Sequence, residues 1–272
     1  MTCSTRVGLD VGGTLIKIAY YNNEKLELLK FPAVHMDAAA EWIQLHCAHA
    51  EIHMTGGRAE MFQKLIPHSV LIMNEFDATC RGVLHLLSES GQSVDSFILT
   101  NVGTGTSIHY VSGKVQTRVG GTGVGGGTMM GLSTLLAGIS RFEDIVRLAP
   151  EGDRGNIDLK VSHIYEGSEP PIPGDLTASN FGRVVQVPTA ERTAADYVAS
   201  VIGLIGETVT TASIFAAAQY SVSNVIYIGS SFVDNAMLQE VVIDYTKLRG
   251  AQPLILTNGE FSGAIGALLA FN

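Results

Sequence analysis

The chain opens with two apolar, β-favouring runs that flank a pair of glycines. Residues 6–11 and 15–21 are these runs, and Gly12 and Gly13 between them predict a hairpin turn. The spacing of apolar positions beyond the hairpin predicts further strands and helices. In chain order these are a strand over 26–31, a helix over 38–50, a strand over 52–55, a helix over 59–65, a strand over 69–73 and a helix over 78–90. This order predicts an α/β arrangement with a mixed sheet.

A second unit with the same opening begins near residue 96. A strand over 97–102 ends in the turn 103–106, and residues 107–111 return as a strand. The later elements are a strand over 114–119, helices over 128–139, 141–148 and 193–219, a strand over 224–228, a helix over 235–248, a strand over 253–256 and a helix from 261. The repeated opening predicts two similar lobes, residues 1–95 and 96–272. We expect a cleft between them and the last helix (about 261–272) near their interface.

Composition and charge narrow the class of protein. Of the 272 residues, 17 are Lys or Arg and 26 are Asp or Glu, and the net charge of −9 argues against nucleic-acid binding. The longest uncharged stretch, 208–233, contains ten Ser, Thr, Asn or Gln side chains, so it does not predict a membrane span. The start of the chain lacks the basic and apolar segments of a secretory leader. We expect a soluble, cytoplasmic protein.

Cysteine and histidine usage does not indicate a metal site. Three Cys without a Cys-x-x-Cys pair fit neither a disulfide framework nor a cysteine-rich zinc site. His46 and His49 would share a helix face, but His53 falls in a predicted strand, so these side chains do not converge. We expect a solvated helix end over 46–53 and assign the stretch no role.

The turn of the first hairpin carries residues that suit a phosphate. Asp10 ends the first strand, Gly12 and Gly13 let backbone amides approach a ligand, and Thr14 adds a hydroxyl. A carboxylate at this position also suits hydrated Mg²⁺. The motif is not a P-loop, because no Gly-Lys-Ser/Thr follows and the next element is a strand. On spacing alone, a plain Gly-Gly hairpin explains the motif equally well.

Two later glycine-rich segments have similar chemistry. Residues 101–107 place amides and hydroxyls, including Thr104, in a second tight turn, and two such turns facing each other would clamp a polyphosphate. Residues 120–128 contain Gly-x-Gly-x-x-Gly, but no βαβ unit surrounds them, which argues against a dinucleotide site. A loop that opens the helix over 128–139, with free amides at the helix N-terminus for a phosphate, fits better.

Two carboxylates and one cation are candidates for catalysis. Glu75 and Asp77 follow the strand over 69–73, where α/β sheets place catalytic side chains, and in an extended segment both would point the same way. Either could be a general base for a hydroxyl, but Asp77 could instead cap the next helix, which leaves Glu75 the freer carboxylate. Arg118, beside the glycine loop, could hold an anionic substrate group or form a surface ion pair.

Taken together, these segments resemble the actin-like, Hsp70 and sugar-kinase superfamily, and within it the type II pantothenate kinases. The matching stretches, which cover essentially the whole chain, are 8–17, 74–78, 101–107, 118–131, 170–178, 227–232 and 261–268. The first is shared across the superfamily, whereas the glycine loop and the Pro-Pro-Ile-Pro-Gly-Asp-Leu segment are narrower and identify the substrate. The resemblance implies two actin-like (ribonuclease H-like) lobes with mixed sheets and an ATP cleft between them.

The resemblance also implies roles for individual residues. Glu75 would be the base that activates the pantothenate hydroxyl, and Asp10 would organise Mg²⁺ through water. Family members are homodimers, and Tyr245 matches a residue that reaches the neighbouring subunit's substrate pocket. The remaining assignments are substrate contacts by Arg118, Thr177 and Ser107, and ATP contacts by Asp10, Gly12, Gly13, Thr14, Lys17, Thr104, Gly125, Gly126, Gly127, Phe142 and Ser230.

The expected function is ATP-dependent phosphorylation of pantothenate to 4′-phosphopantothenate, the first step of coenzyme A biosynthesis. In-line phosphoryl transfer needs positioning and charge neutralisation, which fits a set of glycines, hydroxyls, one base, one cation and one metal carboxylate. One alternative is a sugar or amino-sugar kinase of the same superfamily, although the cysteine-rich zinc motif of one large sugar-kinase group is absent. The other is a non-catalytic nucleotide-binding sensor, which would have no need of a base at Glu75.

Overall fold

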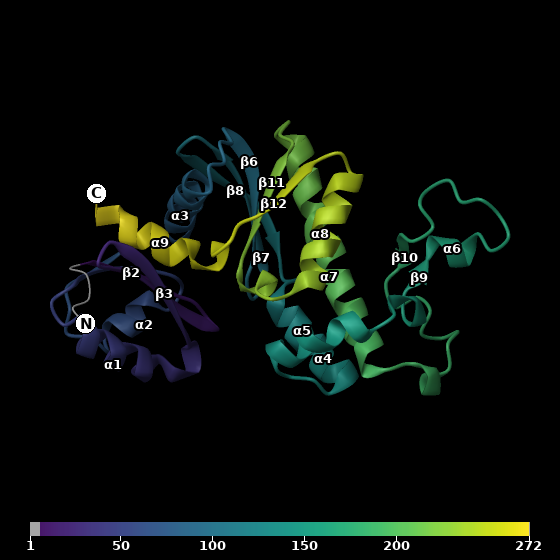
Figure 1. Cartoon of the computed structure of the whole chain (residues 1–272), viewed down its shortest axis with the longest axis horizontal. Coiled ribbons are helices and arrows are strands. Elements are labelled where there is room, and N and C mark those ends of the chain that lie inside the picture. Colours follow the sequence, from purple (N-terminus) through teal and green to yellow (C-terminus); the bar gives the residue numbers. More distant parts are fainter. Residues whose placement is uncertain (1–5, 272) are drawn as a thin grey trace.

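The computed structural model describes residues 6–271, which form two α/β lobes side by side (Figure 1). The N-terminal lobe is built on a five-stranded sheet in the order β3-β2-β1-β4-β5. Its strands are β1 (Arg6–Val11), β2 (Leu15–Asn22), β3 (Lys25–Pro32), β4 (Glu51–Thr55) and β5 (Val70–Ile72). Helices α1 (Met36–His46) and α2 (Ala59–Gln63) pack on one face of this sheet through a shared apolar core.

The C-terminal lobe repeats this arrangement with the order β8-β7-β6-β11-β12. Its strands are β6 (Ser96–Val102), β7 (Thr106–Ser112), β8 (Val115–Thr122), β11 (Asn224–Ile228) and β12 (Gln252–Ile255). In each lobe the first strand is antiparallel to the second and parallel to the fourth. The turns that follow β1 and β6 therefore occupy equivalent places in the two sheets, as the repeated opening predicts.

Two helices lie between the lobes. Each comes from one lobe in sequence and packs on the sheet of the other lobe. Helix α3 (Glu75–Glu89) follows the N-terminal strands but buries Cys80 and Val83 in a cluster with β6 and β11 of the C-terminal lobe. Helix α9 (Ser262–Leu268), near the end of the chain, packs on β2 of the N-terminal lobe. A Cβ at Gly266 would collide with the backbone carbonyl of Ala78, so α3 and α9 touch backbone to backbone.

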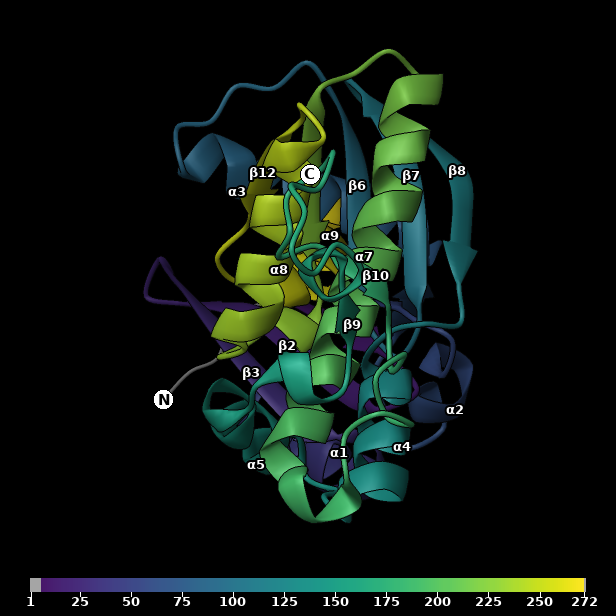
Figure 2. The same ribbon diagram turned by 90° about the vertical axis from the view of Figure 1, so that its right-hand side faces the viewer.

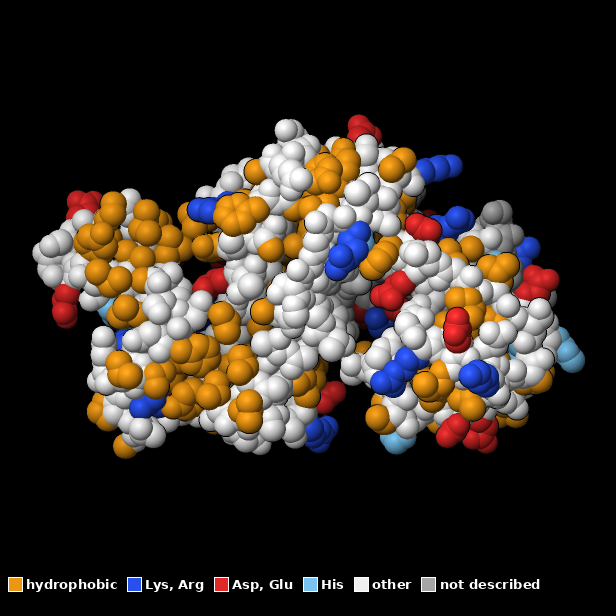
Figure 3. All heavy atoms as spheres, turned by 180° about the vertical axis from the view of Figure 1, so that it is seen from behind, with side chains coloured by type: hydrophobic (Ala, Val, Ile, Leu, Met, Phe, Trp, Pro, Cys, Tyr) orange, Lys and Arg blue, Asp and Glu red, His pale blue; other side chains and the backbone are white. Residues whose placement is uncertain are grey.

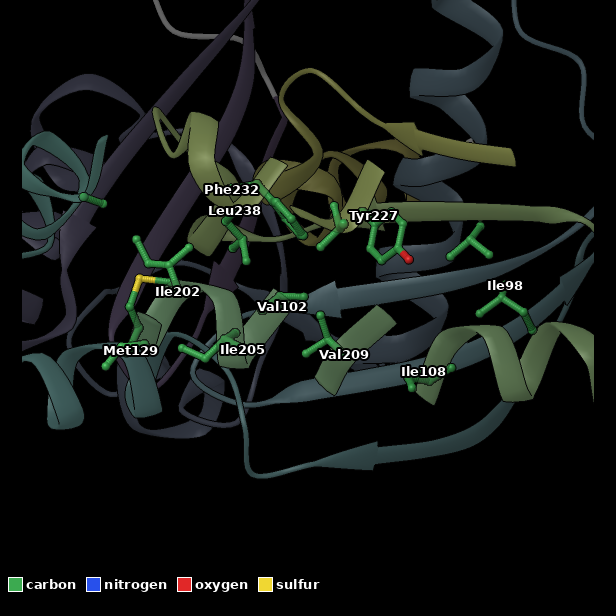
Figure 4. Close-up of a cluster of buried hydrophobic side chains, with 14 of the residues drawn as sticks. Ile98, Val102, Ile108, Met129, Ile202, Ile205, Val209, Tyr227, Phe232 and Leu238 are labelled. Atoms are coloured by element: carbon green, nitrogen blue, oxygen red, sulfur yellow. The ribbon is translucent and has the colours of Figure 1, made fainter. Parts of the chain in front are cut away.

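Helix α7 (Ala194–Gln219) is the central helix of the C-terminal lobe. Its length and apolar composition would suffice to cross a membrane, yet 56% of the relevant window is buried inside the protein. Its apolar side chains pack with Ile98, Tyr227 and Leu238 in one core cluster (Figure 4). Helices α4 (Gly126–Ala137), α5 (Phe142–Leu148) and α8 (Ala236–Leu248) complete that side of the lobe. These contacts identify α7 as a core helix of the C-terminal lobe.

Residues 149–193 form an extension for which the sequence pattern predicted no elements. It contains β9 (Leu159–Lys160), the short helix α6 (Val161–Ile164) and β10 (Thr177–Ser179), and the two strands form a separate antiparallel sheet. The extension lies at the end of the molecule opposite the N-terminal lobe (Figure 1) and faces the viewer in Figure 2. Apolar residues are few and scattered in this segment, so their spacing does not predict strands or helices. Polar contacts hold the extension in place instead.

Candidate active site

The two equivalent hairpin turns meet where the lobes come together. The hydroxyl oxygens of Thr14 and Thr104 lie 3.1 Å apart, although 90 residues separate them in the chain. Gly13 between β1 and β2 is exposed, and nothing lies within 4 Å of the position its Cβ would take. Each turn therefore presents a threonine hydroxyl to the other, and the first turn also has open backbone at Gly13. That the two turns clamp a polyphosphate stays a prediction.

Asp10 and Lys17 form an ion pair beside the first turn. They are directly opposite each other in the β1–β2 hairpin, and Lys17 Nζ lies 3.5 Å from an Asp10 carboxylate oxygen. Both side chains are mostly buried, at 15% and 16% exposure, on the face of the sheet that α9 covers; a Cβ at Gly263 of that helix would lie 3.0 Å from the Asp10 carboxylate. The ion pair therefore lies beside the first turn and is largely shielded from solvent.

Glu75 is the first residue of α3 and lies near this ion pair. The helix is capped by Asn74, whose side-chain oxygen accepts hydrogen bonds from the amides of Phe76 and Asp77. Glu75 is open to solvent on one side, but the surrounding protein desolvates it enough to raise its pKa. The negative charge of Asp10 raises the pKa of Glu75 further, whereas Lys17 opposes this shift. The structure thus brings Asp10, Lys17 and Glu75 into one electrostatic cluster.

The expected geometry of Asp77 is wrong. Asp77 does not cap the helix, because α3 begins three residues earlier than predicted, at Glu75, and Asn74 is its cap. Glu75 and Asp77 therefore lie in the first helical turn, where residues two apart point in different directions. They are not parallel side chains of an extended segment.

Arg118 lies at an irregularity in β8. His109 of β7 pairs with Arg118, whereas the residue before His109 pairs with Gly120. Val119 is therefore left without a partner and forms a β-bulge. Bulges bend a strand locally and redirect its side chains, and they are frequent next to active sites.

The guanidinium of Arg118 lies close to Ser107. A Cβ placed on Gly121 would be 3.1 Å from the Arg118 Nη2 atom and 3.5 Å from the Cα of Ser107. Glycine at this position leaves space for the arginine to lie along the hairpin. The ring of Phe76, which follows Glu75, lies against the ring of His109 opposite Arg118. Ser107 and Arg118 thus lie on neighbouring strands beside Gly121, and the first turn of α3 reaches the same pair of strands through Phe76.

The glycine loop before α4 packs closely against the second hairpin turn. The amides of Gly126 and Gly127 donate to the carbonyls of Gly103 and Thr104, both at 2.8 Å. The expectation of free amides at this helix N-terminus is therefore wrong for these two groups. A Cβ at Gly125 would meet the backbone of Gly105 at 2.8 Å, so close backbone packing accounts for the glycine at that position.

Ser230 lies next to the second turn. The preceding residue, Gly229, has a φ of 118° and leaves no room for a Cβ against the carbonyl of Val102, so β11 ends directly beside β6. Ser231 donates to the carbonyl of Gly103 at 3.3 Å. Phe142, at the start of α5, packs against the core of the C-terminal lobe.

A cavity of about 320 Å³ lies at the carboxyl ends of β11 and β12. Gly229 lines it next to Ser230, and polar side chains come from Asp234, Asn258 and Glu260. The sequence motifs did not indicate these three residues, because they stand in loops without a recognisable pattern. Their only signal is their position just after parallel strands, where α/β sheets place ligand contacts.

Thr177 and Tyr245 do not join the other site residues. Thr177 lies in the extension, where its hydroxyl donates to Glu207 at 2.7 Å and accepts from Arg154 at 3.0 Å. Tyr245 is half-buried on α8, which packs on the opposite face of the C-terminal sheet from α3 (Figure 1). Within one chain, two of the expected substrate contacts are therefore remote from Glu75.

The His46–His53 stretch shows no metal centre. Helix α1 ends at His46, so His49 does not share a helix face with it. The His46 ring stacks on Trp42, with the ring centroids 4.8 Å apart. Within residues 6–271, no group of three or more His, Cys, Asp or Glu side chains is arranged to hold a metal ion.

Sequence comparison relates the chain to one family. A family model described as Fumble matches residues 21–270. A type II pantothenate kinase of Staphylococcus epidermidis (strain ATCC 12228) is 46% identical over 263 residues, which cover 97% of this chain and 99% of that protein. A type II pantothenate kinase of Staphylococcus aureus (strain USA300) is 47% identical over 267 residues, which cover 97% and 98%.

Two solved structures share the architecture at low sequence identity. The activator of the 2-hydroxyisocaproyl-CoA dehydratase from Clostridium difficile, with bound ADPNP, has a TM-score of 0.63 at 13% identity over 97% of this chain and 93% of its own. A ROK family glucokinase from Streptomyces griseus, in complex with glucose and AMPPNP, has a TM-score of 0.57 at 15% identity over 97% and 98%. At these identities the likeness establishes the fold alone, and it confirms the predicted two-lobe, actin-like class.

Proposed function

We propose that this chain, which belongs to the Fumble family and to the type II pantothenate kinases, phosphorylates pantothenate with ATP to give 4′-phosphopantothenate, the first step of coenzyme A biosynthesis. The structural observation that carries this function is the convergence of Asp10, Lys17 and Glu75 beside two facing hairpin turns. A phosphate clamp next to a carboxylate with a raised pKa is the arrangement that transfer of a phosphoryl group to an alcohol requires.

Glu75 is the general base in this proposal. Its carboxylate takes the proton of the pantothenate hydroxyl as that oxygen bonds to the γ-phosphorus of ATP. The bond from the γ-phosphorus to the bridging oxygen breaks, and ADP leaves with that electron pair. A raised pKa makes Glu75 a better proton acceptor near neutral pH, and its solvent-open side leaves room for the hydroxyl.

The two turns are proposed to hold the phosphates of ATP. The backbone of Gly13, the hydroxyls of Thr14 and Thr104 and the ammonium of Lys17 supply donors from both lobes. A contact from Gly12 stays a prediction, since its amide already donates to the Leu15 carbonyl at 3.0 Å. Contacts from residues 125–127 stay a prediction, since Gly126 and Gly127 already donate to the second turn. In this proposal the glycine loop acts mainly by shaping that turn.

Asp10 suits a Mg²⁺ ion held through water. Its carboxylate has one ion pair at 3.5 Å, which leaves acceptor capacity for the water shell that Mg²⁺ usually keeps. When bound, Mg²⁺ would neutralise charge on the phosphates.

The nucleoside half of ATP is proposed to lie near Ser230. The cavity beside it has the size of a small-ligand pocket, and Asn258 and Glu260 offer polar groups for a ribose or a base. Phe142 lies outside that cavity lining, so a contact from its ring to the nucleoside stays a separate prediction.

A homodimer would bring together in one pocket the expected substrate contacts that are far apart within one chain. Thr177 and Tyr245 are remote from Glu75 in the same chain, so a second copy must supply them if both contact pantothenate. The extension also exposes Ile164, Ile172 and Val185, and Figure 3 shows hydrophobic side chains gathered over it. An exposed apolar patch of this kind suits a protein interface. Light scattering that gives the mass of a monomer at micromolar concentration would refute this part of the proposal.

We also propose that residues 1–95 and 96–272 act as the two lobes that close on ATP, with α9 at their interface. The contact between α3 and α9 supports this position for α9. A cytoplasmic location stays a prediction.

The function is tested by measuring ADP release in a coupled assay with four conditions: pantothenate, glucose, N-acetylglucosamine and no acceptor. ADP release that depends on pantothenate supports the proposal. Release that depends on either sugar would favour the alternative sugar kinase, and nucleotide binding without release under any condition would favour the non-catalytic sensor.

A further inference from the structure

His109 is buried between the two parts of the site that carry Arg118 and Glu75. It lies in β7 with 3% of its surface exposed, directly opposite Arg118 at the β-bulge. Its Nδ1 atom lies 3.0 Å from the side-chain oxygen of Gln116 in β8. The centroid of its ring lies 4.6 Å from that of Phe76, the residue after Glu75. One side chain thus contacts both β8 and the first turn of α3.

The hydrogen bond to Gln116 defines the state of the ring. An amide oxygen only accepts, so Nδ1 carries the proton and donates it. Burial lowers the pKa of His109, and the positive charge of Arg118 lowers it further, with the Gln116 bond acting in the opposite direction. His109 is therefore neutral near pH 7 and acts here as a hydrogen-bond donor with an aromatic face.

Arg118 needs such support because of where it lies. Strand β8 is at the edge of its sheet, so only β7 holds it through backbone pairing. At the bulge this pairing is interrupted, because Val119 has no partner. The His109–Gln116 bond joins the two strands next to that interruption, and Gln116 is two residues from Arg118. The bond therefore limits how far β8 can shift where Arg118 leaves it.

We propose that His109 is a positioning residue that holds Arg118 in register with Glu75 through its bond to Gln116 and its packing on Phe76. This inference rests on the proposed function, in which Arg118 binds pantothenate and Glu75 receives its proton. His109 itself lies beneath the surface and is not assigned a contact with substrate.

The test removes the hydrogen bond from either end while keeping the packing. His109→Phe retains a ring against Phe76 and loses the donor, and Gln116→Leu loses the acceptor. We expect each to raise the KM for pantothenate about 5–10-fold, the effect of about one hydrogen bond, with the KM for ATP within about twofold of wild type. The double variant should be no worse than either single variant, because all three lack the same bond.

Two controls keep the outcomes distinct. His68→Phe removes a histidine that is within hydrogen-bond distance of the Cys47 carbonyl in the N-terminal lobe, and it should leave both KM values unchanged. Arg118→Lys tests the substrate contact itself. If Arg118→Lys leaves the KM for pantothenate unchanged, the assigned role of Arg118 fails.

The inference about His109 is overturned in either of two cases. The first is that Arg118→Lys raises the KM for pantothenate while Gln116→Leu, folded as judged by thermal unfolding, does not. The second is that the variants raise both KM values equally, which would indicate a general structural effect. Gln116 is only half-buried, so its variant keeps the test open even if His109→Phe does not fold.

Discussion

Replacing Glu75 by Gln removes the proposed base and little else. Gln keeps the shape of the side chain, and the helix cap is retained because Asn74 supplies it. Loss of a general base lowers kcat by about 10²–10⁴-fold, which corresponds to about 2.7–5.4 kcal/mol of activation free energy. The KM for ATP should not change, because Glu75 is not among the proposed ATP contacts. Steady-state ADP release over a range of ATP concentrations, with pantothenate at saturation, measures both quantities.

The pKa of Glu75 also sets the sign of a stability effect. Burial raises that pKa above the ordinary value of 4.5, and Asp10 raises it further. The folded state therefore binds this proton more tightly than the unfolded state, so the contribution of Glu75 to stability falls as the pH rises above 4.5. Gln does not ionise. We expect the Tm of Glu75→Gln, relative to wild type, to rise between about pH 4 and about pH 7.

Asp77→Asn is the matched control, since Asp77 lies in the same helical turn. An acidic residue there stabilises the N-terminal end of α3 by about 0.3–1 kcal/mol, so this variant should lose a little stability and keep its kcat. Wild-type turnover by Glu75→Gln would refute the assignment of the base. A loss in Asp77→Asn as large as that in Glu75→Gln would show that Asp77 is the base.

Three further predictions concern substrate binding, packing and assembly. Arg118→Lys keeps the charge but loses the planar fork, so the KM for pantothenate should rise and the KM for ATP should not; equal effects would indicate a structural arginine. Gly266→Ala should lower the free energy of unfolding by about 1–3 kcal/mol, because its Cβ meets the Ala78 carbonyl, whereas Gly131→Ala in α4 has open space and should be neutral or stabilising in a denaturant titration. Mixing Glu75→Gln subunits with Tyr245→Ala subunits should give dimers more active than the mean of the parents, because one pocket is then intact. Activity no higher than that mean, with subunit exchange confirmed by mass, would remove Tyr245 from a shared site.

The elements with strong apolar periodicity were predictable, and their ends were less so. The predicted strand over 224–228 matches β11, and the helix predicted over 193–219 matches α7, capped by Thr193. The start of α3 was placed three residues late because the prediction put the cap at Asp77, whereas the helix is capped by Asn74. That small shift decides where Glu75 and Asp77 point.

The parts of the site that depend on contacts between residues far apart in the sequence were not predictable. The turn 12–14 is a local feature of sequence, and the hairpin it forms could be predicted from its two glycines and the flanking β-favouring runs. His109 is different, because its role depends on a bulge in the pairing of β7 with β8 and on the contact with Phe76. In the sequence it is one histidine within an apolar strand. The amides of Gly126 and Gly127 likewise appeared free until the second turn was placed against them.

In the proposed mechanism, the duplicated sheets make catalysis and ATP binding depend on different parts of the core. The turns after β1 and β6 are equivalent, and they meet at the contact between Thr14 and Thr104. Glu75, in contrast, belongs to α3, which follows the N-terminal strands but is anchored by Cys80 and Val83 on the C-terminal sheet. The position of the proposed base therefore depends on the C-terminal core. A change beneath α3 should act on the rate through Glu75 and leave the phosphate turns in place.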